Sequence, residues 1–162
     1  MKRIFVDIER CLSCRSCEIA CGVKHSESKT LFKAIKEDPL PLPRIRVTSQ
    51  QEKAFPIQCR HCPEPYCLYA CIAGAIRRDK ETGLILTDEN KCVHCYSCVM
   101  VCPYGVIRVG GKGEVAVKCD FCQDEEIPPC VEACPTGALF FGEREEFLKI
   151  VEERRNALSH SG

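Results

Sequence analysis

Short apolar runs alternate with polar or glycine-containing turns along the second half of this chain. A charged turn between the segments 75–78 and 84–87 predicts a β-hairpin. The glycine-rich segment 110–113 lies between the runs 106–109 and 115–117 and predicts a second hairpin. The pattern of this region is therefore one of short, local β-structure.

The N-terminal linker and the C-terminal tail follow a different pattern. Residues 22–58 contain a helical stretch around Phe32, then three closely spaced prolines, and then a predicted strand at 44–48. In the tail, apolar side chains recur at helical spacing from residue 143 to residue 158, which predicts an amphipathic helix. The apolar face of that helix carries Phe147, Ile150, Val151 and Leu158.

Cysteine content changes this picture, because 16 of the 162 residues are cysteines. In a short secreted chain, such a density would indicate a disulfide scaffold. However, Asp7 and Glu9 lie where a signal peptide needs an apolar core. The longest nearly apolar stretch, residues 67–76, is about half of the roughly 20 residues that a membrane span needs. We therefore expect a cytoplasmic protein without a membrane span, whose thiols bind metal.

The cysteines form four groups of four. The groups are Cys11, Cys14, Cys17 and Cys21; Cys59, Cys62, Cys67 and Cys71; Cys92, Cys95, Cys98 and Cys102; and Cys119, Cys122, Cys130 and Cys134. Three groups continue into a Cys-x-x-Gly-apolar-apolar frame, and successive frames start 31 and 32 residues apart. This recurrence indicates duplicated structural units, in which the glycine permits a tight turn beside the last cysteine.

Closely spaced cysteines supply three of the four thiolates that a [4Fe–4S] cluster needs. In two-cluster ferredoxins, the last cysteine of a C-x2-C-x2-C-x3-C-P run binds the other cluster. The third group has this spacing without deviation, and the fourth group keeps the ending Cys134-Pro135. Zinc sites usually separate two cysteine pairs by a dozen or more residues, whereas here only three residues separate the last two cysteines of every group. We therefore expect four [4Fe–4S] clusters.

Charge and motifs exclude several classes of function. Lysine and arginine total 23, as do aspartate and glutamate, so the formal net charge is zero. Each oxidised cluster with four thiolates carries about −2, which would bring the loaded protein to roughly −8. This charge disfavours binding to nucleic acids or acidic membranes. Because the sequence also contains no glycine-rich nucleotide motif, we expect an electron carrier that is not itself an enzyme.

The segments Cys59–Cys62 and Lys118–Cys122 resemble the four-cluster electron-transfer subunits of molybdopterin oxidoreductases, formate dehydrogenases and hydrogenases. The resemblance extends over residues 3–142. Within that superfamily, the segments Cys21–Ser26 and Cys71–Ala75 look most like the CooF-type iron–sulfur carrier associated with nickel carbon monoxide dehydrogenase.

This resemblance implies an α+β fold with short β-hairpins, a C-terminal helix and two lobes, each similar to a bacterial two-cluster ferredoxin. An inner lobe, residues 55–108, would be nested in an outer lobe formed by residues 1–54 with 109–162. The implied ligand sets are Cys11, Cys14, Cys17 and Cys134; Cys119, Cys122, Cys130 and Cys21; Cys59, Cys62, Cys67 and Cys102; and Cys92, Cys95, Cys98 and Cys71. The 20 residues between the second and third groups, and the 16 between the third and fourth, would also fit a ferredoxin linker. Spacing alone therefore leaves a sequential arrangement open.

The resemblance also implies partners. Single electrons would pass from a carbon monoxide dehydrogenase-like donor to a hydrogenase or a flavin-dependent NAD(P) reductase. Two alternatives are a free polyferredoxin that buffers electrons, and the beta subunit of a formate dehydrogenase or another molybdopterin enzyme.

Four residues near the cysteines need separate comment. Ile72 and Gly22 stand where the family usually has a proline after the last cysteine of a group, so amide hydrogen bonds to cluster sulfurs would differ there. His61 and His94 lie inside cysteine loops. Because cysteines already supply four ligands per cluster, we expect both histidines to pack against a cluster or tune it without ligating iron.

Overall fold

The structure, a computed structural model, describes residues 2–50, 53–110 and 114–159. Its helices and strands are short. They are β1 (Arg3–Val6), η1 (Ile8–Arg10), α1 (Ser16–Lys24), α2 (Leu31–Ala34), β2 (Ile45–Gln50), β3 (Lys53–Gln58), α3 (Tyr66–Tyr69), β4 (Ile76–Arg78), β5 (Ile85–Thr87), η2 (Glu89–Lys91), α4 (Ser97–Met100), β6 (Arg108–Gly110), β7 (Val115–Val117), α5 (Pro129–Glu132), β8 (Leu139–Gly142) and α6 (Arg144–Ser159).

The described strands pair into antiparallel sheets of two strands each. The two predicted hairpins are confirmed as β4–β5 and β6–β7, although residues 111–113 of the second turn lie outside the described residues. The predicted strand at 44–48 is β2, and it pairs with β3, which the pattern did not indicate. A fourth pair, β1–β8, joins segments far apart in sequence, with Arg3 opposite Gly142. The fold is thus a small mixed structure of helices and two-stranded sheets.

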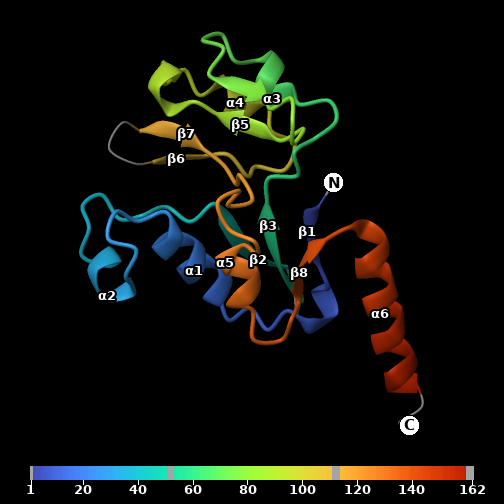
Figure 1. Cartoon of the computed structure of the whole chain (residues 1–162). Helices are drawn as coiled ribbons and strands as arrows, with labels where there is room; N and C mark the ends of the chain where they lie inside the picture. Colours follow the sequence, from blue (N-terminus) through green and yellow to red (C-terminus); the bar gives the residue numbers. More distant parts are fainter. Residues whose placement is uncertain (1, 51–52, 111–113, 160–162) are drawn as a thin grey trace.

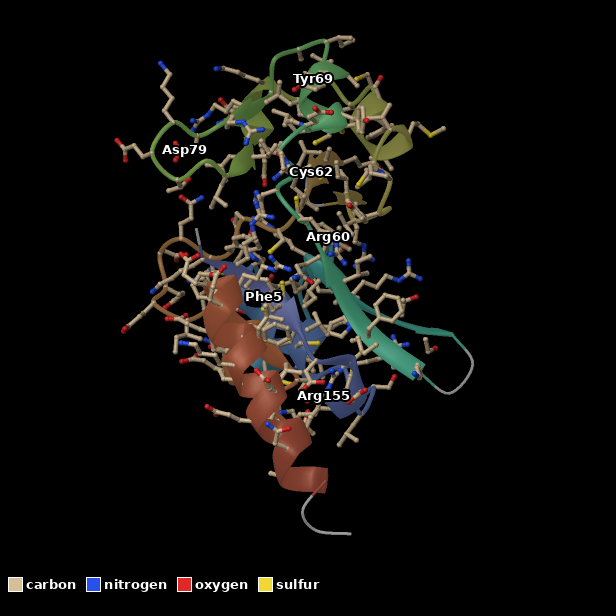
Figure 2. The ribbon with its side chains drawn as sticks, turned by 90° about the vertical axis from the view of Figure 1, so that its right-hand side faces the viewer. Phe5, Arg60, Cys62, Tyr69, Asp79 and Arg155 are labelled. Atoms are coloured by element: carbon tan, nitrogen blue, oxygen red, sulfur yellow. The ribbon has the colours of Figure 1, made fainter. Side chains whose placement is uncertain are left out.

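The predicted C-terminal helix is confirmed as α6, which packs on the β1–β8 pair. The ring of Phe147 stacks on Phe5 at 5.1 Å between centroids and on Phe140 at 6.0 Å. Figure 2 shows Phe5 beside this helix. The side chain of Leu158 lies outside the described residues. Within the described part of the chain, no helix combines the length and the apolar character that crossing a membrane requires.

Buried side chains form two apolar clusters. The larger cluster includes Ile4 and Leu139 of the β1–β8 pair together with Leu84 and Val106, and the smaller one joins Ile76, Ile107 and Ala116. In Figure 1, β4–β5, β6–β7, α3 and α4 lie at one end, whereas α1, α2, α5, α6 and the β1–β8 pair lie at the other. Since α1 and α5 also pack together, the first and last parts of the chain share one end of the molecule.

Candidate functional site

All sixteen cysteines are free thiols, and each of the four groups has the same local structure. The first two cysteines lie in a loop, and the third lies in the helix that follows: α1, α3, α4 or α5. The fourth cysteine comes four residues later, still within α1 or just beyond the shorter helices. The tight turn expected at the glycine of the Cys-x-x-Gly frame is also present. Gly74, Gly105 and Gly137 have left-handed backbone conformation, with φ of 62°, 58° and 61°.

Each cysteine loop is curled by residues with left-handed backbone conformation. These residues are Ser13, Arg15, His61, His94, Tyr96, Phe121 and Cys122. Positive φ is uncommon for such residues and stores strain that is concentrated at functional sites. A turn of this kind also directs consecutive backbone N–H groups to one side, where they stabilise negative charge. In agreement, the N–H of His61 donates to Cys59 Sγ at 3.5 Å.

One small cavity is lined by four thiols from two different groups. Three of them, Cys59, Cys62 and Cys67, belong to the second group, and the fourth is Cys102 of the third group. The other residues that line this cavity are mostly apolar or aromatic. They include Ile85 and Ile107, whose side chains are both buried. Figure 2 shows Cys62 at the end of the molecule that lies away from α6.

A second small cavity repeats this arrangement. It is lined by Cys92, Cys95 and Cys98 of the third group together with Cys71, the last cysteine of the second group. Its other walls are largely apolar, with Ile76 and Ala116 among them. The last cysteine of each of these two groups thus lines the cavity of the other group.

The first and fourth groups meet where α1 packs against α5. Burial raises the pKa of Cys130, and the nearby charges of Cys21, Cys122 and Cys17 raise it further. Burial also raises the pKa of Cys17 to about 11; the backbone hydrogen bond from Glu18 acts in the opposite direction, whereas the charges of Glu18, Cys134 and Cys14 add to the effect of burial. Cys21 therefore lies near Cys130, and Cys134 lies near Cys17.

Burial makes several other thiols poor acids in the free chain. It raises the pKa of Cys67 to about 11 and the pKa of Cys122 to about 12. At neutral pH these sulfurs keep their protons unless a positive centre stabilises the thiolates. Binding of a cationic metal core at these positions therefore releases protons.

Two exposed cysteines behave differently because a serine follows each of them two positions later. Cys14 Sγ and Ser16 Oγ are 3.4 Å apart, and hydrogen bonds from Ser16 lower the pKa of Cys14. Hydrogen bonds from Ser97 lower the pKa of Cys95 in the same way. The repeated Cys-x-Ser-Cys motif of the first and third groups thus makes one exposed thiol in each group more acidic than a free cysteine.

The two loop histidines have unlike surroundings. His61 is 1 % exposed, accepts a hydrogen bond at Nδ1 from the N–H of Ile85 at 2.9 Å, and contacts the Phe121 ring at 4.3 Å between centroids. Burial lowers the pKa of His61 to about 3, so the ring is neutral. His94, by contrast, is exposed. His61 therefore packs between the second and fourth cysteine loops.

Two further side chains lie near the cysteines, although the sequence pattern did not single them out. His25 Nε2 lies 3.9 Å from Cys122 Sγ, and a carboxylate oxygen of Asp120 lies close to both. Lys118 is buried, with only 4 % of its surface exposed. The sequence position of Lys118, directly before the first cysteine of a group, does not predict that it is buried, because Lys91 occupies the same position in the third group.

The chemistry of this donor set fits an iron–sulfur cluster. Each cavity brings four soft sulfur donors together, and no carboxylate lines either cavity among the described residues. Thiolate ligands in largely apolar surroundings are typical of iron–sulfur clusters. The sixteen thiols suffice for four such sites.

Comparison with known proteins agrees with this assignment. Residues 50–144 match the family described as the 4Fe-4S dicluster domain. An iron-sulfur protein of Rhodospirillum rubrum is 38 % identical, and the match covers 94 % of this chain and 87 % of that protein. Electron transport protein HydN of Escherichia coli is 36 % identical, with 94 % of each chain covered. The beta subunit of formate dehydrogenase 2 from Nitratidesulfovibrio vulgaris is 32 % identical over 94 % of this chain and 81 % of that subunit.

Proposed function

Because the chain belongs to the family of 4Fe-4S dicluster domain proteins, we propose that it is an electron carrier that holds four [4Fe–4S] clusters. The observation that carries the proposal is the pair of cavities, each lined by four thiols from two cysteine groups. The similarity to an electron transport protein over 94 % of both chains supports the same function. In this function the chain has no substrate chemistry of its own.

The proposed ligand sets follow an exchange of the last cysteine between paired groups. They are Cys11, Cys14, Cys17 and Cys134; Cys119, Cys122, Cys130 and Cys21; Cys59, Cys62, Cys67 and Cys102; and Cys92, Cys95, Cys98 and Cys71. The third and fourth sets are supported by the two cavities that these thiols line. The first two are supported by the packing of α1 on α5 and by the electrostatic contacts of Cys17 and Cys130.

We further propose that the sets are divided between two nested lobes, an inner lobe of residues 55–108 and an outer lobe of residues 1–54 with 109–162. Pairing of β1 with β8 supports the outer lobe, because it joins the two ends of the chain. The smaller apolar cluster supports the inner lobe, and it also receives Ala116 from the β6–β7 hairpin. The inner lobe thus packs against a hairpin of the segment that returns to the outer lobe.

Electron transfer in such a protein places simple demands on the polypeptide. When bound, each cluster takes up and releases one electron. The chain itself holds the thiolates and excludes water, for example with the buried side chains of Ile85 and Ile107. Backbone donors stabilise the negative sulfurs, as the N–H of Arg44 does at 3.1 Å from Cys21 Sγ. No nucleophile or general base is needed.

For partners, we propose a carbon monoxide dehydrogenase-like donor and, as acceptor, a hydrogenase or a flavin-dependent NAD(P) reductase. The CooF-like segments Cys21–Ser26 and Cys71–Ala75 support this choice. Sixteen free thiols are suited to a reducing compartment, so we place this exchange in the cytoplasm. The similarity to a formate dehydrogenase beta subunit favours a second candidate, the beta subunit of a molybdopterin enzyme. A free polyferredoxin remains the third.

Anaerobic purification of the untagged chain from its own cells tests these proposals in one experiment. We expect about sixteen iron and sixteen sulfide per chain, because sixteen cysteines match four cubanes. We also expect carbon monoxide dehydrogenase to be the enzyme retained with the chain. Stoichiometric zinc, or roughly eight irons, would contradict the four-cluster proposal. Co-purification of a molybdopterin enzyme would establish the second candidate, and a chain that binds no enzyme would favour the electron buffer.

A further inference from the structure

Lys118 extends from the fourth cysteine group into the region of the second. It lies between β7 and Cys119, yet its Nζ donates a hydrogen bond to the backbone carbonyl of Ile85 in β5. Ile85 is 1 % exposed and lines the cavity that Cys59, Cys62, Cys67 and Cys102 surround. The ammonium group is therefore held beside a wall of that cavity.

Among the described residues, no carboxylate lies within ion-pair distance of the buried Lys118 ammonium, whose hydrogen-bond acceptor is the Ile85 carbonyl. The cations near the first and fourth groups differ, since Arg44 pairs with Asp120 at 2.5 Å and Lys24 pairs with Asp124 at 2.5 Å. A buried cation without a counter-charge is unfavourable, so nearby thiolates are its natural complement.

Electrostatic effects on the thiols agree with this geometry. Burial raises the pKa of Cys59, and the Lys118 charge acts in the opposite direction. The same holds for Cys67, where Lys118 is again the largest influence opposing burial. For Cys98 in the neighbouring cavity, the charges that act on the thiol are those of other cysteines. The charge of Lys118 thus acts on two thiols of this ligand set.

We propose that Lys118 is a positioning charge that raises the reduction potential of the cluster held by Cys59, Cys62, Cys67 and Cys102. The inference rests on the ligand sets proposed above. Reduction adds one electron from the donor and changes the charge of the cluster with its thiolates from about −2 to −3, without bond formation or proton transfer. A fixed positive charge in a region of low polarity stabilises the more negative, reduced form.

Redox titration of the anaerobic holoprotein, followed by electron paramagnetic resonance, tests the proposal in the Lys118→Met variant. We expect the equilibrium constant for reduction of one cluster to fall about tenfold, which for one electron is about 59 mV. The other three potentials should stay unchanged, and Lys118→Arg should restore the original value because it keeps the charge. Unchanged potentials in Lys118→Met, or equal shifts of all four, would overturn the proposal.

Lys91→Gln is the matched control. Lys91 precedes Cys92 as Lys118 precedes Cys119, but its side chain is 63 % exposed and pairs with Asp88 at 3.5 Å. We expect this variant to shift no potential.

Cluster retention separates tuning from a structural role. If the Lys118→Met protein loses iron, the redox titration is repeated with Lys118→Gln, because the glutamine amide retains a donor for the Ile85 carbonyl. Iron loss in both neutral variants would assign Lys118 to cluster retention and overturn the tuning proposal. Failure of the proposed function has a different signature, since the unmodified chain would then lack its four clusters.

Discussion

Cys102 shows that the cysteine group to which a residue belongs in the sequence does not decide which cavity it lines. It ends the third cysteine group, yet it lines the cavity of the second group with Cys59, Cys62 and Cys67. Cys71 makes the reverse exchange. The reason is geometric, because three thiols from one loop surround a cavity on one side and the fourth must come from a segment that packs over the opening.

Double variants test this exchange without the need to identify each cluster. Cys102→Ala and Cys59→Ala should each damage one and the same cluster, so the double variant should lose no more intact clusters than either single variant. Combining Cys102→Ala with Cys92→Ala should instead damage two clusters. Iron content and the integrated paramagnetic signal of the reduced protein measure the difference. The reverse pattern would establish that the groups bind independently.

Unlike α1, α3, α4 and α5, the long helix α6 carries no cysteine. A helix of 16 residues is only marginally stable alone in water, so packing has to hold it in place. The stack of Phe147 on Phe5 and Phe140 provides that contact. The neighbouring residue, Leu148, is 49 % exposed.

Removal of the Phe147 ring should release this helix while the clusters remain bound. We expect Phe147→Ala to weaken docking of α6 by about 2 kcal/mol, since the ring is partly buried and loses two aromatic contacts. Hydrogen exchange of the α6 amides should accelerate roughly 30-fold. Leu148→Ala is the control and should leave exchange nearly unchanged. Equal exchange rates in Phe147→Ala and the unmodified protein would contradict the assigned role of the ring.

In the whole molecule, cysteine side chains occupy much of the interior. Of the thirteen buried residues in the larger apolar cluster, five are cysteines: Cys17, Cys21, Cys59, Cys119 and Cys130. The described sheets have two strands each, and isolated pairs of this kind are marginal in water. Ligation therefore has to supply cohesion that a larger apolar core supplies in other proteins.

Removal of iron should consequently unfold most of the chain. Anaerobic chelation under reducing conditions is expected to abolish the far-ultraviolet circular dichroism of the native protein and to open the loops to protease, because metal binding and folding are coupled. Re-addition of iron and sulfide should restore both. A stable apo-protein with native-like circular dichroism and a cooperative thermal transition would contradict this expectation.

Local features of this protein could be predicted from the sequence alone. Cysteine spacing identified the cofactor class, turn residues placed the hairpins β4–β5 and β6–β7, and helical periodicity placed α6. These features depend on neighbours a few residues apart, whose relative positions the backbone restricts directly. The pairing of β1 with β8 and the buried position of Lys118 depend on contacts between distant segments. Lys118 and Lys91 have the same local sequence position, and only packing buries one and leaves the other in water.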